Sequence, residues 1–78
     1  MKKEIKMPSF GDGTDSAVLC AWLKEPGESY RKGEALCEIE AKKVVSQLEA
    51  ESDGVLVRQL AEEGDEVAVN EALCEVEV

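Results

Sequence analysis

The chain has 78 residues and is 44% hydrophobic, and 9 basic residues against 18 acidic ones give it a net charge of −9. This length accommodates one small domain, residues 1–78, and the apolar content is that of a globular protein. The acidic charge disfavours nucleic acid and anionic membrane surfaces as partners. The chain also contains no histidine, so the commonest general base and a frequent metal ligand are missing.

No apolar run approaches the roughly 18 residues of a membrane span, and the N-terminal residues do not lead into the apolar segment of a signal peptide. We therefore expect a cytoplasmic protein, or a protein of the mitochondrial matrix if the source is eukaryotic. Cys20, Cys37 and Cys74 form no C-x-x-C pair, which argues against a disulfide framework and a metal site. Three reduced thiols packed in the core are expected, and a redox role for Cys37 and Cys74 is the alternative.

Alternating apolar and polar residues predict strands, which in chain order include Cys37–Glu40, Val44–Ala50 and Cys74–Val78. In the second of these strands, Val44, Ser46, Leu48 and Ala50 share the expected inner face. Turn signals separate the segments, and they are Gly11-Asp12-Gly13, Pro26-Gly27, Lys32-Gly33, Asp53-Gly54 and Glu63-Gly64. Their spacing of about ten residues predicts an all-β sandwich or flattened barrel of two small antiparallel sheets.

The two residues Lys42 and Lys43 link the first two of these strands, and this spacing predicts a tight hairpin. Because the link lacks Asn-Gly or Asp-Gly, we expect an ordinary type I turn. Adjacent lysines at a protruding tip are conspicuous in an acidic chain. Composition alone favours lysines that simply solvate an edge turn, and a role as an acceptor that another enzyme acylates is the alternative.

The chain repeats itself at an offset of 37 residues, with 11 of 23 positions identical between Val18–Glu40 and Val55–Glu77. Two copies are too few for a stacked solenoid, so two halves that bury each other about a pseudo-two-fold axis are expected. Cys37 and Cys74 fall at equivalent inward positions near that axis. Lys43 would correspond to a position two residues beyond Val78, so the hairpin tip and the chain end are predicted to be opposite poles of the body.

Four segments resemble a lipoyl domain of the 2-oxo acid dehydrogenase complexes, within the biotinyl and lipoyl carrier superfamily. These segments are Glu4–Pro8 with Gly11, Ala21–Leu23 with Pro26–Glu28, Glu38–Val44, and Glu49–Ala50 with Asp53–Val55. The third is similar to the family's E-I-E-T-D-K-A around its modified lysine. Relative to Lys43, Gly27 lies 16 residues before, Gly54 lies 11 after and Glu40 lies three before, as in the family.

The resemblance implies two four-stranded antiparallel sheets related by a pseudo-dyad, a barrel-sandwich hybrid. It implies that Lys43 is amide-linked to lipoic acid by a lipoate-attaching ligase or transferase. It further implies a swinging arm serving a thiamine-dependent dehydrogenase, an acyltransferase and a dihydrolipoamide dehydrogenase, with no catalysis by the domain itself. The residues expected to be recognised by the ligase or partners are Glu40, Gly27, Lys42, Ala41, Val44 and Gly54.

The chain departs from the family pattern beside the modified lysine, where Lys42 replaces the usual Asp and Val44 the frequent Ala. The same two residues replace both methionines of the biotin carriers' E-A-M-K-M, which argues against biotin more than against lipoate. A biotin carrier of an acyl-CoA carboxylase or decarboxylase is one alternative reading. An unmodified interaction module of the same fold is the other.

Overall fold

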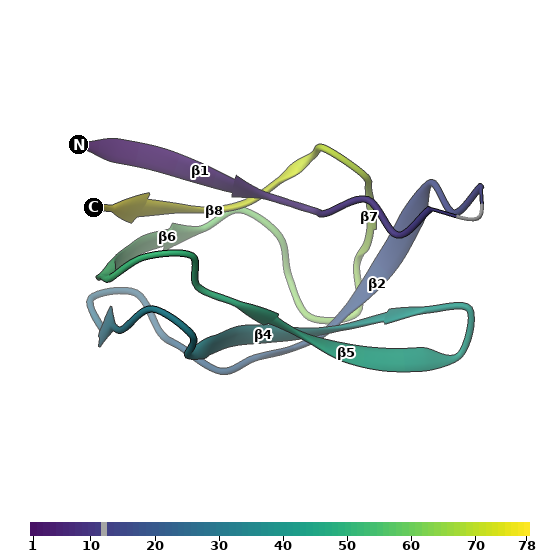
Figure 1. Cartoon of the computed structure of the whole chain (residues 1–78), viewed down its shortest axis with the longest axis horizontal. Helices are drawn as coiled ribbons and strands as arrows, with labels where there is room; N and C mark the ends of the chain where they lie inside the picture. Colours follow the sequence, from purple (N-terminus) through teal and green to yellow (C-terminus); the bar gives the residue numbers. More distant parts are fainter. Residues whose placement is uncertain (12) are drawn as a thin grey trace.

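The described residues, 1–11 and 13–78 of a computed structural model, contain eight strands in two four-stranded antiparallel sheets (Figure 1). One sheet has the order β1-β8-β6-β3 and the other β5-β4-β2-β7. The bounds are β1 Lys2–Lys6, β2 Ser16–Trp22, β3 Ser29–Tyr30, β4 Ala35–Ala41, β5 Val44–Glu49, β6 Gly54–Gln59, β7 Glu66–Ala68 and β8 Ala72–Glu77. The all-β expectation and the two antiparallel sheets are confirmed.

Backbone hydrogen bonds show that the two halves are equivalent. The N–H of Gly27 donates to the carbonyl of Leu56 at 2.7 Å, and the N–H of Gly64 donates to the carbonyl of Leu19 at the same distance. Both pairs are related by the 37-residue offset. The turns repeat as well, because Gly33 and Asn70 occupy matching positions with φ of 90° and 75°, a region that glycine and asparagine tolerate best. The repeat in the sequence is therefore a repeat in three dimensions.

The core lies between the sheets and includes both predicted inward cysteines. Cys37 is 0% exposed and Cys74 is 1% exposed. Burial raises the pKa of Cys37 to about 12 and that of Cys74 to about 11, so both thiols are neutral at physiological pH and poor nucleophiles. The other fully buried large side chains are Met7, Leu19, Leu36, Ile39, Leu56, Leu73 and Val76.

Two burial expectations are wrong. Cys20 is only half-buried, because Ala17 and Leu19 of β2 point into the core and the alternation of the strand turns Cys20 outward. On β5, Val44 is 63% exposed and Ser46 is also exposed, while Leu48 is half-buried and the following Ala50 is buried. The inner face expected along the whole strand is thus buried only at the end far from the tip.

The body is elongated, with extents of 32 × 19 × 19 Å. The turn between β4 and β5 lies at one end of the long axis, and both chain termini lie at the other (Figure 1). This arrangement confirms the two predicted poles.

Of the Gly11-Asp12-Gly13 turn, Asp12 lies outside the described residues, whereas Gly11 and Gly13 both have positive φ, 71° and 70°. Among the described residues there is no helix that could cross a membrane.

Candidate modification site

The β4–β5 hairpin ends in a two-residue turn, closed by the pair Ala41 and Val44. The turn is not the ordinary type I turn expected from the sequence, since Lys42 has a φ of 52° and Lys43 a φ of 66°. Positive φ at both central residues is the signature of a type I′ turn, whose twist matches that of the strands it joins. For non-glycine residues this conformation costs about 1–2 kcal/mol each. The strand pairing of the hairpin therefore overrides the local preference of two lysines.

Lys43 stands at the tip of this hairpin with an exposed side chain. Within residues 1–11 and 13–78, its ammonium group has neither a hydrogen bond nor an ion pair. Because the turn has only two residues, few other side chains lie near that of Lys43. The ε-amino group is consequently accessible to a large enzyme.

The structure brings four of the predicted recognition residues next to Lys43. Glu40 and Ala41 end β4 and are half-buried, Lys42 shares the turn, and Val44 starts β5. The sequence reasoning gave no special role to Val45, which pairs with Glu40 and is 56% exposed. Two consecutive valines directly after the turn, Val44 and Val45, are the sequence signal that indicates this surface.

The two predicted recognition glycines lie elsewhere, against the opposite sheet. Gly27 bonds to Leu56 of β6 and has a φ of 93°. Gly54 begins β6, and a Cβ there would lie 2.6 Å from the hydroxyl oxygen of Tyr30 and 2.7 Å from the carbonyl oxygen of Glu77. The structure thus gives both glycines a role in the body of the domain. It does not bring either of them to Lys43.

The tip offers the amine of Lys43 as an acceptor for modification. Within the described part of the chain, no group of three or more cysteine, aspartate or glutamate side chains could hold a metal ion. The two buried thiols lie in the core, where raised pKa values keep them protonated. An amine on a narrow, rigid projection can still be acylated by another enzyme. It would then carry the attached group away from the body.

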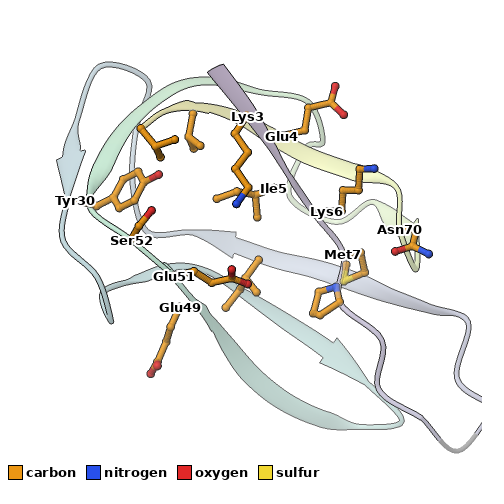
Figure 2. Close-up of a pocket in the computed structure, with 14 residues that line it drawn as sticks. Lys3, Glu4, Ile5, Lys6, Met7, Tyr30, Glu49, Glu51, Ser52 and Asn70 are labelled. Carbon is orange, nitrogen blue, oxygen red and sulfur yellow. The ribbon is translucent and has the colours of Figure 1, made fainter. Parts of the chain in front are cut away.

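A groove of about 310 Å³ lies away from the tip, between β1 and β5 (Figure 2). Its lining includes Ile5 and Met7 from the β1 side and Leu48 and Glu49 of β5. Figure 2 shows the two strands facing each other across this space. It is remote from Lys43 and contains none of the predicted site residues.

A pseudo-symmetric barrel-sandwich with an exposed lysine on a two-residue hairpin tip is the architecture of carrier domains that bear a covalently attached cofactor. A family model described as "Biotin-requiring enzyme", the biotin and lipoyl attachment family, matches residues 3–76. The chain belongs to this family.

Its curated relatives include named components of 2-oxo acid dehydrogenases. It is 41% identical over 56 residues to the dihydrolipoyllysine-residue succinyltransferase component of the 2-oxoglutarate dehydrogenase complex of Pseudomonas aeruginosa, over 72% of this chain and 14% of that protein. The mouse mitochondrial pyruvate dehydrogenase protein X component is 38% identical over 70% of the chain and 11% of its own length. The chain therefore spans about a seventh or less of these curated relatives.

Among solved structures, the lipoyl domain of the 2-oxoglutarate dehydrogenase complex from Azotobacter vinelandii superimposes with a TM-score of 0.80. It is 35% identical, and the match covers 96% of this chain and 95% of that one. A single-chain long-chain acyl-CoA carboxylase shares the fold with a TM-score of 0.81 at 20% identity, over 97% of this chain and 7% of that one. The chain thus has the fold of a lipoyl domain over nearly its whole length.

Proposed function

We propose that this chain is a lipoyl carrier domain and that Lys43 is the residue to which lipoic acid is attached. The observation that carries the proposal is the position of Lys43 on a two-residue tip, exposed and free of charged partners among the described residues. The 35% identity to a solved lipoyl domain over almost the full chain supports lipoate as the group. Attachment would form an amide between the lipoyl carboxyl carbon and Nζ of Lys43, with release of the activating group on that carboxyl and a proton from the amine.

The residues around the tip fit such a group. The lysine side chain adds its own four-carbon reach to the arm, and the rigid hairpin keeps the attachment point clear of the body. Lipoic acid supplies a redox-active disulfide that accepts an acyl group and electrons. A long arm on a fixed point raises the effective concentration of the carried group at several active sites without dissociation.

The domain itself contributes presentation and no catalysis in this proposal. The partners would be a lipoate-attaching ligase or transferase and the dehydrogenase, acyltransferase and dihydrolipoamide dehydrogenase of a 2-oxo acid dehydrogenase complex. Two relatives are named as components of 2-oxoglutarate and pyruvate dehydrogenase complexes, and this supports that class of assembly. We place the carrier in the cytoplasm, or in the matrix of a mitochondrion, where a subcellular fractionation would find it.

Intact-mass measurement tests the attachment. The purified chain, incubated with a lipoate ligase, lipoate and ATP, should gain one lipoyl group, and peptide mapping should locate it on Lys43. Lys43→Ala should abolish the gain and Lys42→Ala should preserve it. The reverse pattern would move the site by one residue, and no gain with a ligase that modifies a control lipoyl domain would overturn the proposal.

Biotin is the second candidate, because the family includes biotin carriers and a carboxylase shares the fold. The same incubation with a biotin ligase and biotin decides between the two. We expect no biotin adduct, since Lys42 and Val44 stand where biotin carriers have methionines.

A further inference from the structure

The four edge strands of the two sheets are protected unequally. Two of them, β3 and β7, have only two and three residues. The edge strand β1, with sequence KKEIK, carries four charged residues. The edge strand β5, with sequence VVSQLE, is six residues long and has one charge, Glu49 at its far end. Short edges and edge lysines prevent a further strand from pairing, so β5 is the one edge among these that is left open.

The pseudo-symmetry makes this contrast a matched comparison. Because β5 pairs with β4 as β1 pairs with β8, Val45 and Gln47 occupy the positions that Lys2 and Glu4 occupy in the other half. At these two equivalent positions β1 therefore has two charged side chains, whereas β5 has none. The groove of about 310 Å³ between β1 and β5 keeps the two edges apart, so β1 does not cover β5 (Figure 2).

The backbone groups that β5 offers can be deduced from the hairpin. In a two-residue hairpin the residues flanking the turn, here Ala41 and Val44, form a hydrogen-bonded pair. Bonded and non-bonded pairs then alternate along antiparallel strands. The N–H and carbonyl groups of Val45 and Gln47 consequently point away from β4, toward the open side.

The charge beside this edge indicates what would pair with it. Glu40 and Glu38 of β4 lie opposite Val45 and Gln47, so their carboxylates are on the same face. On the other face, Val44 is 63% exposed. A strand added here would have Val45 and Gln47 as its nearest neighbours on that face, and the carboxylates of β4 would lie one strand farther, about 10 Å across the sheet. The long side chain of a lysine or arginine at alternate positions spans that distance over the apolar stem of its neighbour. The residues between them would lie next to Val44 and the rest of the other face. A second copy is a poor occupant, because it would bring the same acids and another net charge of −9.

We propose that β5 is a docking edge for an extended segment, basic at alternate positions, of the enzyme that attaches the group to Lys43. Pairing along β5 leads the enzyme to the residue adjoining Lys43, and strand register fixes where that lysine falls. This inference rests on the proposed function. It goes further by naming the surface that the enzyme binds.

Paired proline variants test the docking edge. Gln47→Pro removes an outward N–H and leaves the β4 ladder intact, as proline does on sheet edges. Glu4→Pro removes the equivalent N–H from β1. With a lipoate ligase, Gln47→Pro should lower kcat/KM for modification at least tenfold, while Glu4→Pro should stay within twofold of the unaltered chain. Thermal unfolding of each variant shows whether it is folded.

A variant that adds a charge to β5 tests the docking edge independently, in case the proline variants do not fold. Val45→Lys copies Lys2 onto β5 and should also lower kcat/KM about tenfold. Hydrogen exchange of the complex with the ligase should slow at the amides of Val45 and Gln47 and stay unchanged at Glu4.

Each contrary result has a distinct meaning. Equal kcat/KM values for folded Val45→Lys and the unaltered chain, with unprotected β5 amides, would overturn the docking edge and leave lipoylation intact. No modification of the unaltered chain would overturn the proposed function and the docking edge together. A dimer in sedimentation that Val45→Lys dissociates would assign β5 to a second copy and overturn the enzyme as occupant.

Discussion

Met1 and Val78 exchange two backbone hydrogen bonds, from the N-terminal ammonium to the carbonyl of Val78 at 2.8 Å and from the N–H of Val78 to the carbonyl of Met1 at 2.9 Å. By the registers of β1–β8 and β4–β5, this pair occupies the place of Ala41 and Val44 in the other half. The Lys42-Lys43 turn therefore corresponds to a two-residue link that is missing between the termini. Two strand pairs with the same geometry end in the Lys42-Lys43 turn at one pole and in Met1 and Val78 at the other.

Closing the termini of this 78-residue chain with Asn-Gly should create a second hairpin and stabilise the fold. Asn-Gly is the preferred two-residue turn, and closure removes conformational freedom from the unfolded chain. By analogy with the stabilisation that disulfide cross-links typically give, we expect the free energy of unfolding to rise by about 2–4 kcal/mol. Denaturant titration of the cyclic chain measures this, with a linear chain ending in Asn-Gly as the control. Equal stabilities would show that the termini are not held as a hairpin end.

Replacing Lys42 by Asn should stabilise the domain. Lys42 has a φ of 52°, and asparagine adopts this conformation at lower cost than lysine. We expect a gain of about 0.5–1 kcal/mol in the free energy of unfolding, with lipoylation of Lys43 preserved. Urea titration and intact mass are the measurements. A loss of stability would mean that the side chain of Lys42 contributes more to the hairpin than its backbone strain costs.

Glu40→Ala should slow lipoylation without unfolding the protein. Glu40 is half-buried beside the tip, and a change at such a surface position alters stability by about 0.5 kcal/mol or less. Its pseudo-symmetric equivalent Glu77 lies at the other pole, so Glu77→Ala should leave the rate of modification unchanged. A similar rate for both variants would remove Glu40 from the recognition surface.

Substitutions at Gly27 and Gly54 should both destabilise the domain, but for different physical reasons. Gly27 needs its φ of 93°, with open space around its Cα, so Gly27→Ala should cost about 1–2 kcal/mol and Gly27→Asn less. At Gly54 a Cβ meets the Tyr30 hydroxyl and the Glu77 carbonyl, so both Gly54→Ala and Gly54→Asn should cost about 1–3 kcal/mol. Chemical denaturation of the four variants separates strain from overpacking. Rescue by asparagine at Gly54 would contradict the packing explanation.

Stability should fall at alkaline pH because of the buried thiols. In the unfolded chain a thiol has a pKa of about 8.5, whereas in the fold Cys37 and Cys74 have pKa values of about 12 and about 11. The stabilisation is therefore complete below the unfolded pKa and is lost as pH rises toward the folded values, since only the unfolded chain releases these protons. Melting temperatures from neutral to strongly alkaline pH measure the loss. A Cys37→Ala, Cys74→Ala chain should lose less over that range, and an equal loss would assign the effect to other groups.

Much of the fold followed from local pattern. The period of two at Cys37–Glu40 and the 37-residue repeat predicted paired antiparallel halves, because side-chain alternation and turn residues act within a few positions. The same patterns placed Cys37 and Cys74 in the core. The hairpin around Lys43 was predicted from spacing alone, and the pairing of Ala41 with Val44 confirms it.

The sequence by itself thus determined the class of fold, the two poles and the lysine at one of them. Only the tertiary structure decided the turn conformation, since the twist of β4 and β5 forces positive φ on two lysines. It also decided that Val44 is exposed, because burial depends on how far the opposite sheet reaches. The contrast between the charged edge β1 and the open edge β5 required the registers of both strand pairs, which no local pattern contains.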